Sequence, residues 1–299
     1  MISMKKSRKS KSLGNQHKAA ILFLLPNLLG FLIFIVYPVL RAFQISLHDW
    51  DGLTPPVFVG FSNYIQVFAD SAFRVSLLNN VHYTLVTVPL GIGLGIAIAM
   101  LMNVKIPGIK IFRTIYFLPQ ITSMIAIGIV WTTVLANHGP VNQFLEFAGM
   151  KNPPQWLSSI SWALISVEIV SVWRSMGYNA IILLAGLQGI NAELYEAGKI
   201  DGANGWQRFI KITLPMLSPT IFFCTIMAVI GSFQVFDTIM GMTQGGPGRA
   251  TNVLTYYIYQ RAFVNQRFGY ASAIAYVLFG IILIITLIQF RGQKKWVNY

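Results

Sequence analysis

Long apolar stretches without charged residues are the feature that most restricts what this chain can fold into. Five stretches of 21 or more residues contain no Asp, Glu, Lys or Arg, and they cover residues 19–40, 81–102, 114–136, 212–236 and 270–290. A sixth, 161–187, contains only Glu168 and Arg174 as charged residues. A helix needs about 20 mostly apolar residues to cross the hydrocarbon core of a bilayer. The chain is therefore predicted to be an all-α, polytopic membrane protein with about six transmembrane helices.

Composition excludes an ordinary soluble domain. Of 299 residues, 55% are hydrophobic and 10% are charged, whereas a soluble domain carries about 25% charged residues. The net charge of +13 does not indicate nucleic-acid binding, because the basic residues are divided into short clusters between the apolar stretches. The single cysteine, Cys224, lies inside an apolar stretch, so no disulfide framework is expected.

The distribution of Lys and Arg predicts the orientation in the membrane. The basic tail 1–18, the loops after the second and fourth spans, and the tail 291–299 together contain 15 Lys and Arg, whereas the other loops contain 6. Short loops rich in Lys and Arg stay in the cytoplasm. Both termini are therefore predicted to be cytoplasmic, with the domain 19–290 in the cell membrane.

The loop 191–215 between the fourth and fifth spans has the pattern of a short helix-turn-helix. Asn191 is a suitable N-cap, Glu193 lies in the predicted first turn, and Gly202 is suited to end the helix. A second, amphipathic segment follows and leads to Pro215. Such a structure favours a contact site for another protein; the alternative is an ordinary polar connecting loop.

The same loop resembles the EAA loop of the transmembrane subunits of binding-protein-dependent ABC importers. That signature is Glu-Ala-Ala, three residues, Gly, nine residues, then Ile-x-Leu-Pro, and the matching positions here are Glu196, Ala197, Gly202, Ile212, Leu214 and Pro215. The chain departs from it at Gly198, where a second Ala is usual. The resemblance implies the type I permease fold and a loop that couples to an ATPase, to which Glu196 and Asp201 offer negative charge.

Other segments narrow the resemblance to the sugar-importing group, and to its maltose-permease first subunit. They are Val59–Tyr64, Leu184–Ile190 and the Gly245–Pro247 turn, which is expected near the docking surface of a binding protein. The resemblance implies a homologous second permease, two ATPase subunits seated on the EAA loops, and an extracytoplasmic sugar-binding protein. ATP would be bound by the ATPase subunits, so this chain is predicted to be neither an enzyme nor a cofactor-binding protein.

A sugar pathway at mid-membrane needs hydrogen-bonding groups and aromatic faces. Residues of this kind on the fourth and fifth spans are Tyr178, Asn179, Ser232, Gln234, Phe236 and Asp237. By resemblance, Tyr178 and Ser232 fall where the maltose-type permease contacts its substrate. The alternative is that these polar residues hold helices together.

The two charges of the fourth span have two possible roles. Glu168 and Arg174 are six residues apart, about 240° around an ideal helix, so they do not face each other. Each could pair with another helix or subunit, or could line the pathway. Four histidines are scattered without metal-ligand spacing, so no metal site is predicted. Gly91 and Gly95 favour close helix packing rather than nucleotide binding.

Two alternatives to a sugar importer remain at this point. One keeps the architecture and changes the cargo, for example to glycerol 3-phosphate. A phosphate would need Lys or Arg near mid-span, and only Arg174 qualifies, which favours an uncharged sugar. The other is a protein of a different class, either a membrane-embedded enzyme or a proton-coupled carrier, and a carrier would work without an ATPase.

Overall fold

The computed structural model describes residues 21–104 and 106–297. The predicted tail 1–18, residues 19–20 of the first predicted span, Lys105 and residues 298–299 of the second tail lie outside the described residues. In chain order the elements are η1 (Leu32–Val36), α2 (Tyr37–Ser46), β1 (His48–Asp49), β2 (Val57–Phe58), α3 (Ser62–Ala69), α4 (Ser71–Met102), α5 (Ile109–Ile121), α6 (Met124–Val134), α7 (Pro140–Phe147), α8 (Ile160–Gln188), α9 (Ala192–Ile200), α10 (Gly205–Arg208), η2 (Phe209–Thr213), α11 (Leu214–Phe233), α12 (Asp237–Met242), α13 (Leu254–Tyr259), η3 (Gln260–Val264), α14 (Phe268–Gly292) and η4 (Gln293–Lys295).

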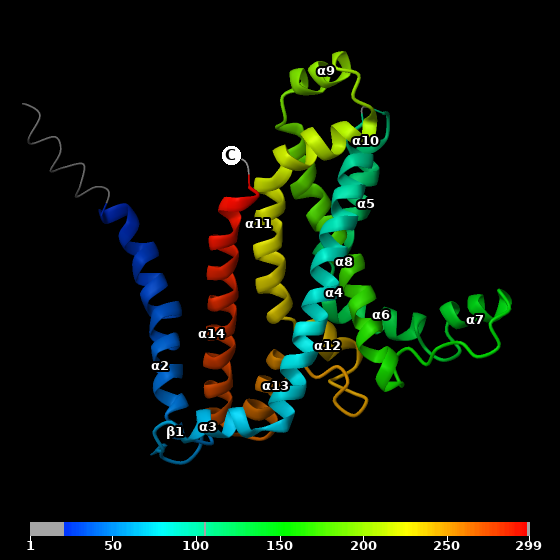
Figure 1. Ribbon diagram of the computed structural model, residues 1–299. Helices are drawn as coiled ribbons and strands as arrows, with labels where there is room; N and C mark the ends of the chain where they lie inside the picture. The colour runs from blue at the N-terminus through cyan, green and yellow to red at the C-terminus, as the bar shows by residue number, and fades with distance from the viewer. Residues whose placement is uncertain (1–20, 105, 298–299) are drawn as a thin grey trace, which may run out of the picture.

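The long helices confirm an all-α membrane architecture. Within the described residues, five helices are long and apolar enough to cross a bilayer: Ile21–Ser46, Ser71–Met102, Ile160–Gln188, Gly205–Phe233 and Phe268–Gly292. A sixth crossing results if a bent helix pair is counted as one span. The long helices run side by side between two ends, with α9 and α10 at one end and β1, α3 and α13 at the other (Figure 1). We call these the α9 end and the α13 end.

The stretch predicted as the third span, 114–136, is two helices rather than one. Helices α5 and α6 meet at a bend of 99° after Ile121. Thr122 has an extended backbone there, three residues beyond Pro119, which cannot donate a helical hydrogen bond. Tertiary packing holds the bend, because a Cβ atom built on Gly128 of α6 would lie 3.0 Å from the backbone of Gly241 in α12.

Glycines bring α8 close to its neighbours. A Cβ built on Gly95 of α4 would lie 2.8 Å from the Cβ of Asn179, which confirms that this glycine serves helix packing. A Cβ on Gly177 would lie 1.8 Å from the carbonyl oxygen of Tyr116 in α5. Because backbones approach this closely only where side chains are small, α8 is the helix against which α4 and α5 are placed.

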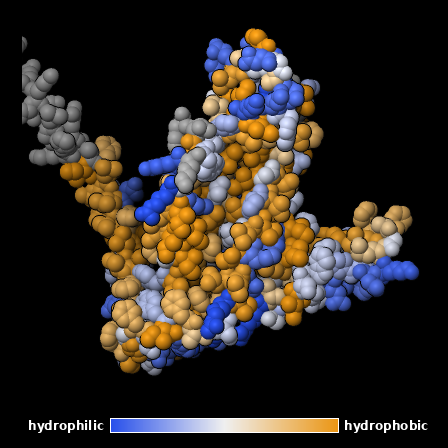
Figure 2. All heavy atoms as spheres, in the orientation of Figure 1, coloured by the Kyte–Doolittle hydropathy of each residue, from blue (hydrophilic) through white to orange (hydrophobic). Residues whose placement is uncertain are grey.

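The first spanning helix is almost free of the bundle. None of the most apolar part of Ile21–Ser46 is buried within the chain. It touches the bundle near its C-terminal end, where Phe43 packs on Tyr276 of α14. In Figure 2 its surface and the flanks of the bundle are hydrophobic, whereas hydrophilic residues gather at the α9 end and along the α13 end. Lipid or another protein must therefore cover this helix.

The α13 end is built from short elements that fix the start of the bundle. Strands β1 and β2 pair antiparallel, with His48 opposite Phe58. The buried Asn63 side chain donates hydrogen bonds to the carbonyl oxygens of Ser46 and His48, both at 2.9 Å. These contacts attach the loop after the first helix to α3.

Candidate functional site: a loop between spans and an interhelical cavity

The α9 helix forms as its end residues predict. The side chain of Asn191 accepts a hydrogen bond from the Glu193 N–H at 3.0 Å, capping the helix. Gly202 has a left-handed backbone with φ of +76°, which glycine adopts at little cost. The Ala203 N–H then donates to the Gly198 carbonyl at 2.9 Å, which closes the helix end.

The second segment of the loop is the beginning of the fifth spanning helix. Asn204 and Gln207 form a reciprocal capping box at the start of α10, and the helix then continues without a break from Gly205 to Phe233. The π-helical turn η2 ends at Thr213, two residues before Pro215, whose missing N–H leaves a carbonyl of that turn without its α-helical donor. The loop is therefore continuous with a spanning helix that enters the bundle.

The α9 helix is seated on the base of that long helix. A Cβ built on Gly198 would lie 2.9 Å from Cδ1 of Ile212, so the unusual glycine permits a close approach. The hydroxyls of Tyr195 and Thr213 lie 3.1 Å apart and form a hydrogen bond. The two halves of the loop thus form one unit.

The outer surface of this unit is exposed and partly apolar. Glu196, Ala197 and Asp201 are exposed, and so are the side chains of Ile200 (87%) and Trp206 (68%). A cavity of about 380 Å³ opens between the halves, and it is lined by Gly198, Asp201, Gly202, Ala203, Gln207, Arg208, Lys211 and Ile212. Four of the predicted coupling residues therefore meet at one cavity, while Leu214 and Pro215 lie in the helix below it.

A second cavity, of about 260 Å³, lies between α4, α8, α11 and α12. It is lined by Tyr83, Thr87, Val88, Ser171, Arg174, Ala228, Gly231, Ser232, Gln234, Val235, Phe236, Asp237 and Thr238. Of the predicted pathway residues, Ser232, Gln234, Phe236 and Asp237 lie here, together with the intramembrane Arg174. The four predicted residues lie on the end of α11 and the turn into α12, which begins at Asp237, and the fold brings Arg174 of α8 to them.

The chemistry of this interhelical cavity suits polar, uncharged ligands. Arg174 supplies donors and Asp237 supplies an acceptor, and no ion pair joins the two among the described residues. The Nε atom of Arg174 is buried without a hydrogen-bond partner. Ser232 is already engaged, because its hydroxyl lies 2.8 Å from the Thr84 hydroxyl and donates to the Val229 carbonyl. A hydroxyl-rich ligand can both donate and accept here.

Tyr178 and Asn179 do not line this cavity. Asn179 is buried between α8 and α4, where its side chain packs against Gly95. Asn179 therefore lies where a polar residue would hold two helices together, which was the alternative to a role in the sugar pathway. Tyr178 lies on an exposed part of α8.

The two charges of α8 are placed apart, as their spacing predicts. Glu168 is paired with His82 of α4, with 2.8 Å between Oε1 and Nδ1, and it borders an apolar groove of about 350 Å³. Arg174 instead lines the interhelical cavity. The sequence analysis did not identify His82 as the partner of Glu168. The signal available was a histidine in one predicted span and a carboxylate in another.

Asn80 is a further residue that sequence reasoning missed. Its side chain is fully buried, donates to the Ser232 carbonyl at 3.0 Å and accepts from the Leu254 N–H at 2.9 Å. It therefore joins α4 to the end of α11 and the start of α13. The sequence places Asn80 beside Asn79, directly before the apolar stretch 81–102, and nothing in that local pattern predicts this role.

A bundle of apolar helices with a polar cavity between them, and with an exposed helical unit continuous with one span, defines a membrane transport subunit that works with another protein. The chain belongs to the family of binding-protein-dependent transport system inner membrane components, whose model matches residues 91–295. This confirms the predicted family and fold class, and a transport subunit rather than an enzyme.

Similar proteins agree with this family along almost the whole chain. A probable ABC transporter permease, YesP of Bacillus subtilis, is 37% identical over 98% of this chain and 96% of its own length. The lactose transport system permease LacF of Rhizobium radiobacter is 36% identical over 92% and 93%. A crystal structure of a bacterial ABC transporter that imports alginate has a chain with a TM-score of 0.84 and 24% identity, covering 98% of this chain and all of its own.

Proposed function

We propose that this chain is the permease subunit of an ATP-driven, binding-protein-dependent sugar importer, and that it moves sugar by alternating access. The observation that carries the proposal is the rigid unit at the α9 end. It presents exposed carboxylates and apolar side chains to a partner and is continuous with the spanning helix Gly205–Phe233.

The coupling residues divide into two groups in this proposal. Glu196, Ala197, Gly198, Asp201 and Gly202 contact a separate ATPase subunit. Ile212, Leu214 and Pro215 transmit its movement, because they lie in the continuous helix Gly205–Phe233, whose far end borders the interhelical cavity. The basic residues near this end favour a cytoplasmic location for it and for both termini.

Sugar as the cargo is supported by the relatives and by the cavity. A trehalose/maltose transport system permease, MalF of Thermococcus litoralis, is 33% identical over 94% of this chain, and LacF is named for lactose. Arg174, Gln234 and Asp237 can pair with hydroxyl groups, and Phe236 offers a ring face. We also assign Tyr178 to the sugar pathway. It lies on a side of α8 that a second permease would cover to complete the pathway.

A phosphate cargo such as glycerol 3-phosphate is disfavoured by charge. Arg174 shares its cavity with Asp237, and a carboxylate repels a dianion at close range. A proton-coupled carrier would not need the exposed unit at the α9 end.

The remaining partners follow from the surfaces left uncovered. The helix Ile21–Ser46 stands off the bundle (Figure 1), and we propose that a homologous second permease packs against it. Two ATPase subunits then seat on the two loops, and an extracytoplasmic binding protein delivers the sugar at the α13 end.

The test is transport by the assembled complex, with its ATPase and second permease co-expressed. Glu196→Lys and Gly202→Asp should leave the protein inserted while transport falls at least about tenfold relative to ATP hydrolysis. Gly108→Asp is the matched control, because Gly108 also has a left-handed backbone, with φ of +84°, and nothing near its Cβ position. Normal uptake by both loop variants, or uptake without any ATPase, would refute the proposal.

The pathway residues are tested by uptake of the cognate sugar. Arg174→Gln and Asp237→Asn should raise the half-saturation concentration, whereas Asn179→Ala should act on protein yield instead. Unchanged half-saturation and rate in Arg174→Gln, Ser232→Ala and Tyr178→Ala together would remove these residues from the pathway.

A further inference from the structure

A third cavity, of about 380 Å³, lies at the α13 end, between the loop after α12 and the η3 turn. Its lining contains two arginines, Arg249 and Arg261, and no acidic residue. Four side-chain amides complete the polar lining: Gln244, Asn252, Gln260 and Asn265. Guanidinium and amide groups pointing at one space are the donors that bind a carboxylate.

The loop that carries Arg249 is held by its backbone. The side chain of Asn79 donates to the carbonyls of Arg249 and Asn252 at 3.0 and 2.9 Å. Thr251 donates to the Gly246 carbonyl at 2.8 Å. Arg249 has a left-handed backbone, with φ of +72°, and among the described residues its side chain has no hydrogen bond or ion pair. The backbone at Arg249 is therefore held in place, and the guanidinium group of Arg249 is available to a ligand.

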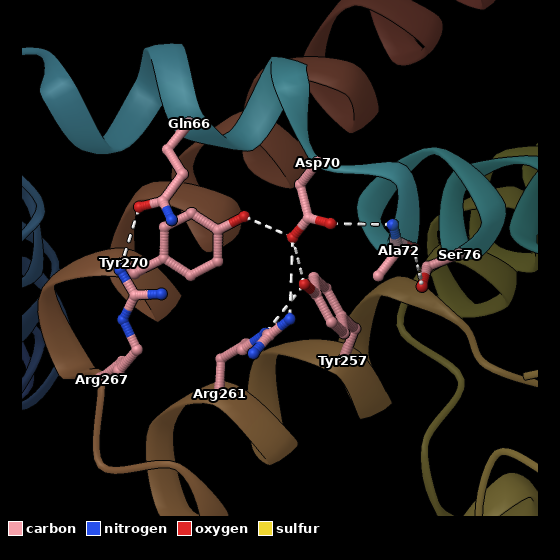
Figure 3. A network of polar contacts seen from close by, with 8 residues as sticks. All are labelled: Gln66, Asp70, Ala72, Ser76, Tyr257, Arg261, Arg267 and Tyr270. Atoms are coloured by element: carbon pink, nitrogen blue, oxygen red, sulfur yellow. Dashed lines mark hydrogen bonds and ion pairs between the residues drawn. The ribbon is translucent and has the colours of Figure 1, made fainter.

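The second arginine is oriented by a network that joins η3, α13 and α14 to Asp70, the residue between α3 and α4 (Figure 3). Nε of Arg261 donates to the Tyr257 hydroxyl at 2.8 Å, and the guanidinium lies 4.8 Å from the centre of the Tyr257 ring. Tyr257 and Tyr270 both donate to the carboxylate of Asp70. The Asp70 carboxylate is 3.8 Å from Nη2 of Arg261, too far for a strong hydrogen bond. Arg261 therefore keeps donors for a ligand without having to reorganise.

We infer that this cavity receives an acidic side chain of the extracytoplasmic binding protein, with Arg249 and Arg261 as its two cationic contacts. The inference rests on the proposed function, which gives the α13 end an extracytoplasmic partner. Charge complementarity supports it, because the lining contains two guanidinium groups and no carboxylate. The Asp70 carboxylate behind the cavity offsets the charge of Arg261, whereas Arg249 has no acidic partner among the described residues, so a net positive charge remains to attract an acidic surface.

The experiment uses the complete transporter in nanodiscs with its own binding protein, and measures their dissociation constant at low and physiological salt. Arg249→Glu should weaken binding at least about tenfold, and Arg249→Lys less, because the charge remains while the two-pronged geometry is lost. Arg74→Glu is the matched control: this exposed arginine of the same end lies outside the cavity, and its substitution should change binding less than about twofold. Arg249→Gln should also flatten the salt dependence.

Equal effects of Arg249→Glu and Arg74→Glu would overturn the inference. So would competition by free galacturonate that depends on Arg249, since the site would then take a sugar acid rather than a protein side chain. Failure of the proposed function has a different signature, because no complex with an ATPase would form. All four variants should hydrolyse ATP at the wild-type rate when the binding protein is absent. This measurement separates failure of the inference from failure of the proposed function.

Discussion

Glu168 of α8 and His82 of α4 form a hydrogen-bonded pair, with 2.8 Å between Oε1 and Nδ1, in which only the histidine reaches the surface. The side chain of Glu168 is 3% exposed and that of His82 is 55% exposed. A buried carboxylate is thus connected to its surroundings through one half-exposed partner. Glu168 borders an apolar groove and is not among the residues that line the cavity of Arg174.

His82→Ala should destabilise the protein, because it leaves the Glu168 carboxylate buried without its partner. Loss of a buried acceptor's partner costs about 1–3 kcal/mol. Glu168→Gln should cost less, since a neutral amide is cheaper to bury. The free energy of unfolding in mixed micelles measures both, and the double variant should cost less than the sum of the two. A stability of His82→Ala equal to that of the wild type would contradict this account.

Gly177→Ala should disrupt the packing of α5 on α8. The added Cβ would lie 1.8 Å from the Tyr116 carbonyl oxygen, and a backbone atom cannot rotate away as a side chain can. Gly93→Ala is the matched control, because nothing lies within 4 Å of its Cβ position, and alanine favours a helix by about 1 kcal/mol over glycine. We expect a loss of folded protein in the first variant and unchanged or higher thermal stability in the second. Similar thermal stability of both would refute the close approach.

Asn80→Ala should weaken the attachment of α4 to α11 and α13. Two buried backbone groups, the Ser232 carbonyl and the Leu254 N–H, lose their partner, at a cost of roughly 1–3 kcal/mol each. The neighbouring Asn79→Ala is the control, since Asn79 is less buried and holds only the loop at 249–252. Unfolding in mixed micelles should rank Asn80→Ala as the less stable variant, and the reverse order would count against the assignment.

Asp70→Asn should remove a contribution to stability that depends on pH. Burial alone would raise the pKa of Asp70, but hydrogen bonds from Tyr257, Tyr270 and the Ala72 N–H, with the charge of Arg261, outweigh it and lower the pKa below its ordinary 3.8. A carboxyl with a lowered folded pKa stabilises the protein above its unfolded pKa, and the contribution is lost as pH falls through the folded pKa. Burial also raises the pKa of Tyr257, so its hydroxyl stays a donor.

The stability difference between wild type and Asp70→Asn should therefore be constant from neutral pH to about pH 5 and should shrink below about pH 4. Thermal unfolding across this range measures it. Asp49→Asn is the control, because the Asp49 side chain is exposed and has no hydrogen bond or ion pair among the described residues. A difference that grows on acidification would have the wrong sign.

The features that could be predicted from the sequence are those encoded in short windows. Runs of apolar residues predicted the spanning helices, because a bilayer demands about 20 such residues in succession. Asn191 and Gly202 predicted the two ends of α9, because capping is a contact between residues a few positions apart. The spacing from Glu196 to Pro215 predicted the family.

Only the tertiary structure decided which distant residues meet. The bend between α5 and α6 brings Gly128 against Gly241, a contact that no local pattern contains. Asp70 accepts hydrogen bonds from Tyr257 and Tyr270, which lie 187 and 200 positions later in the sequence. Whether a polar residue such as Asn179 or Asp237 faces a helix or a cavity depends on how helices rotate and approach one another. Such contacts arise from the packing of whole helices, so the sequence names the participants while the three-dimensional arrangement determines their partners.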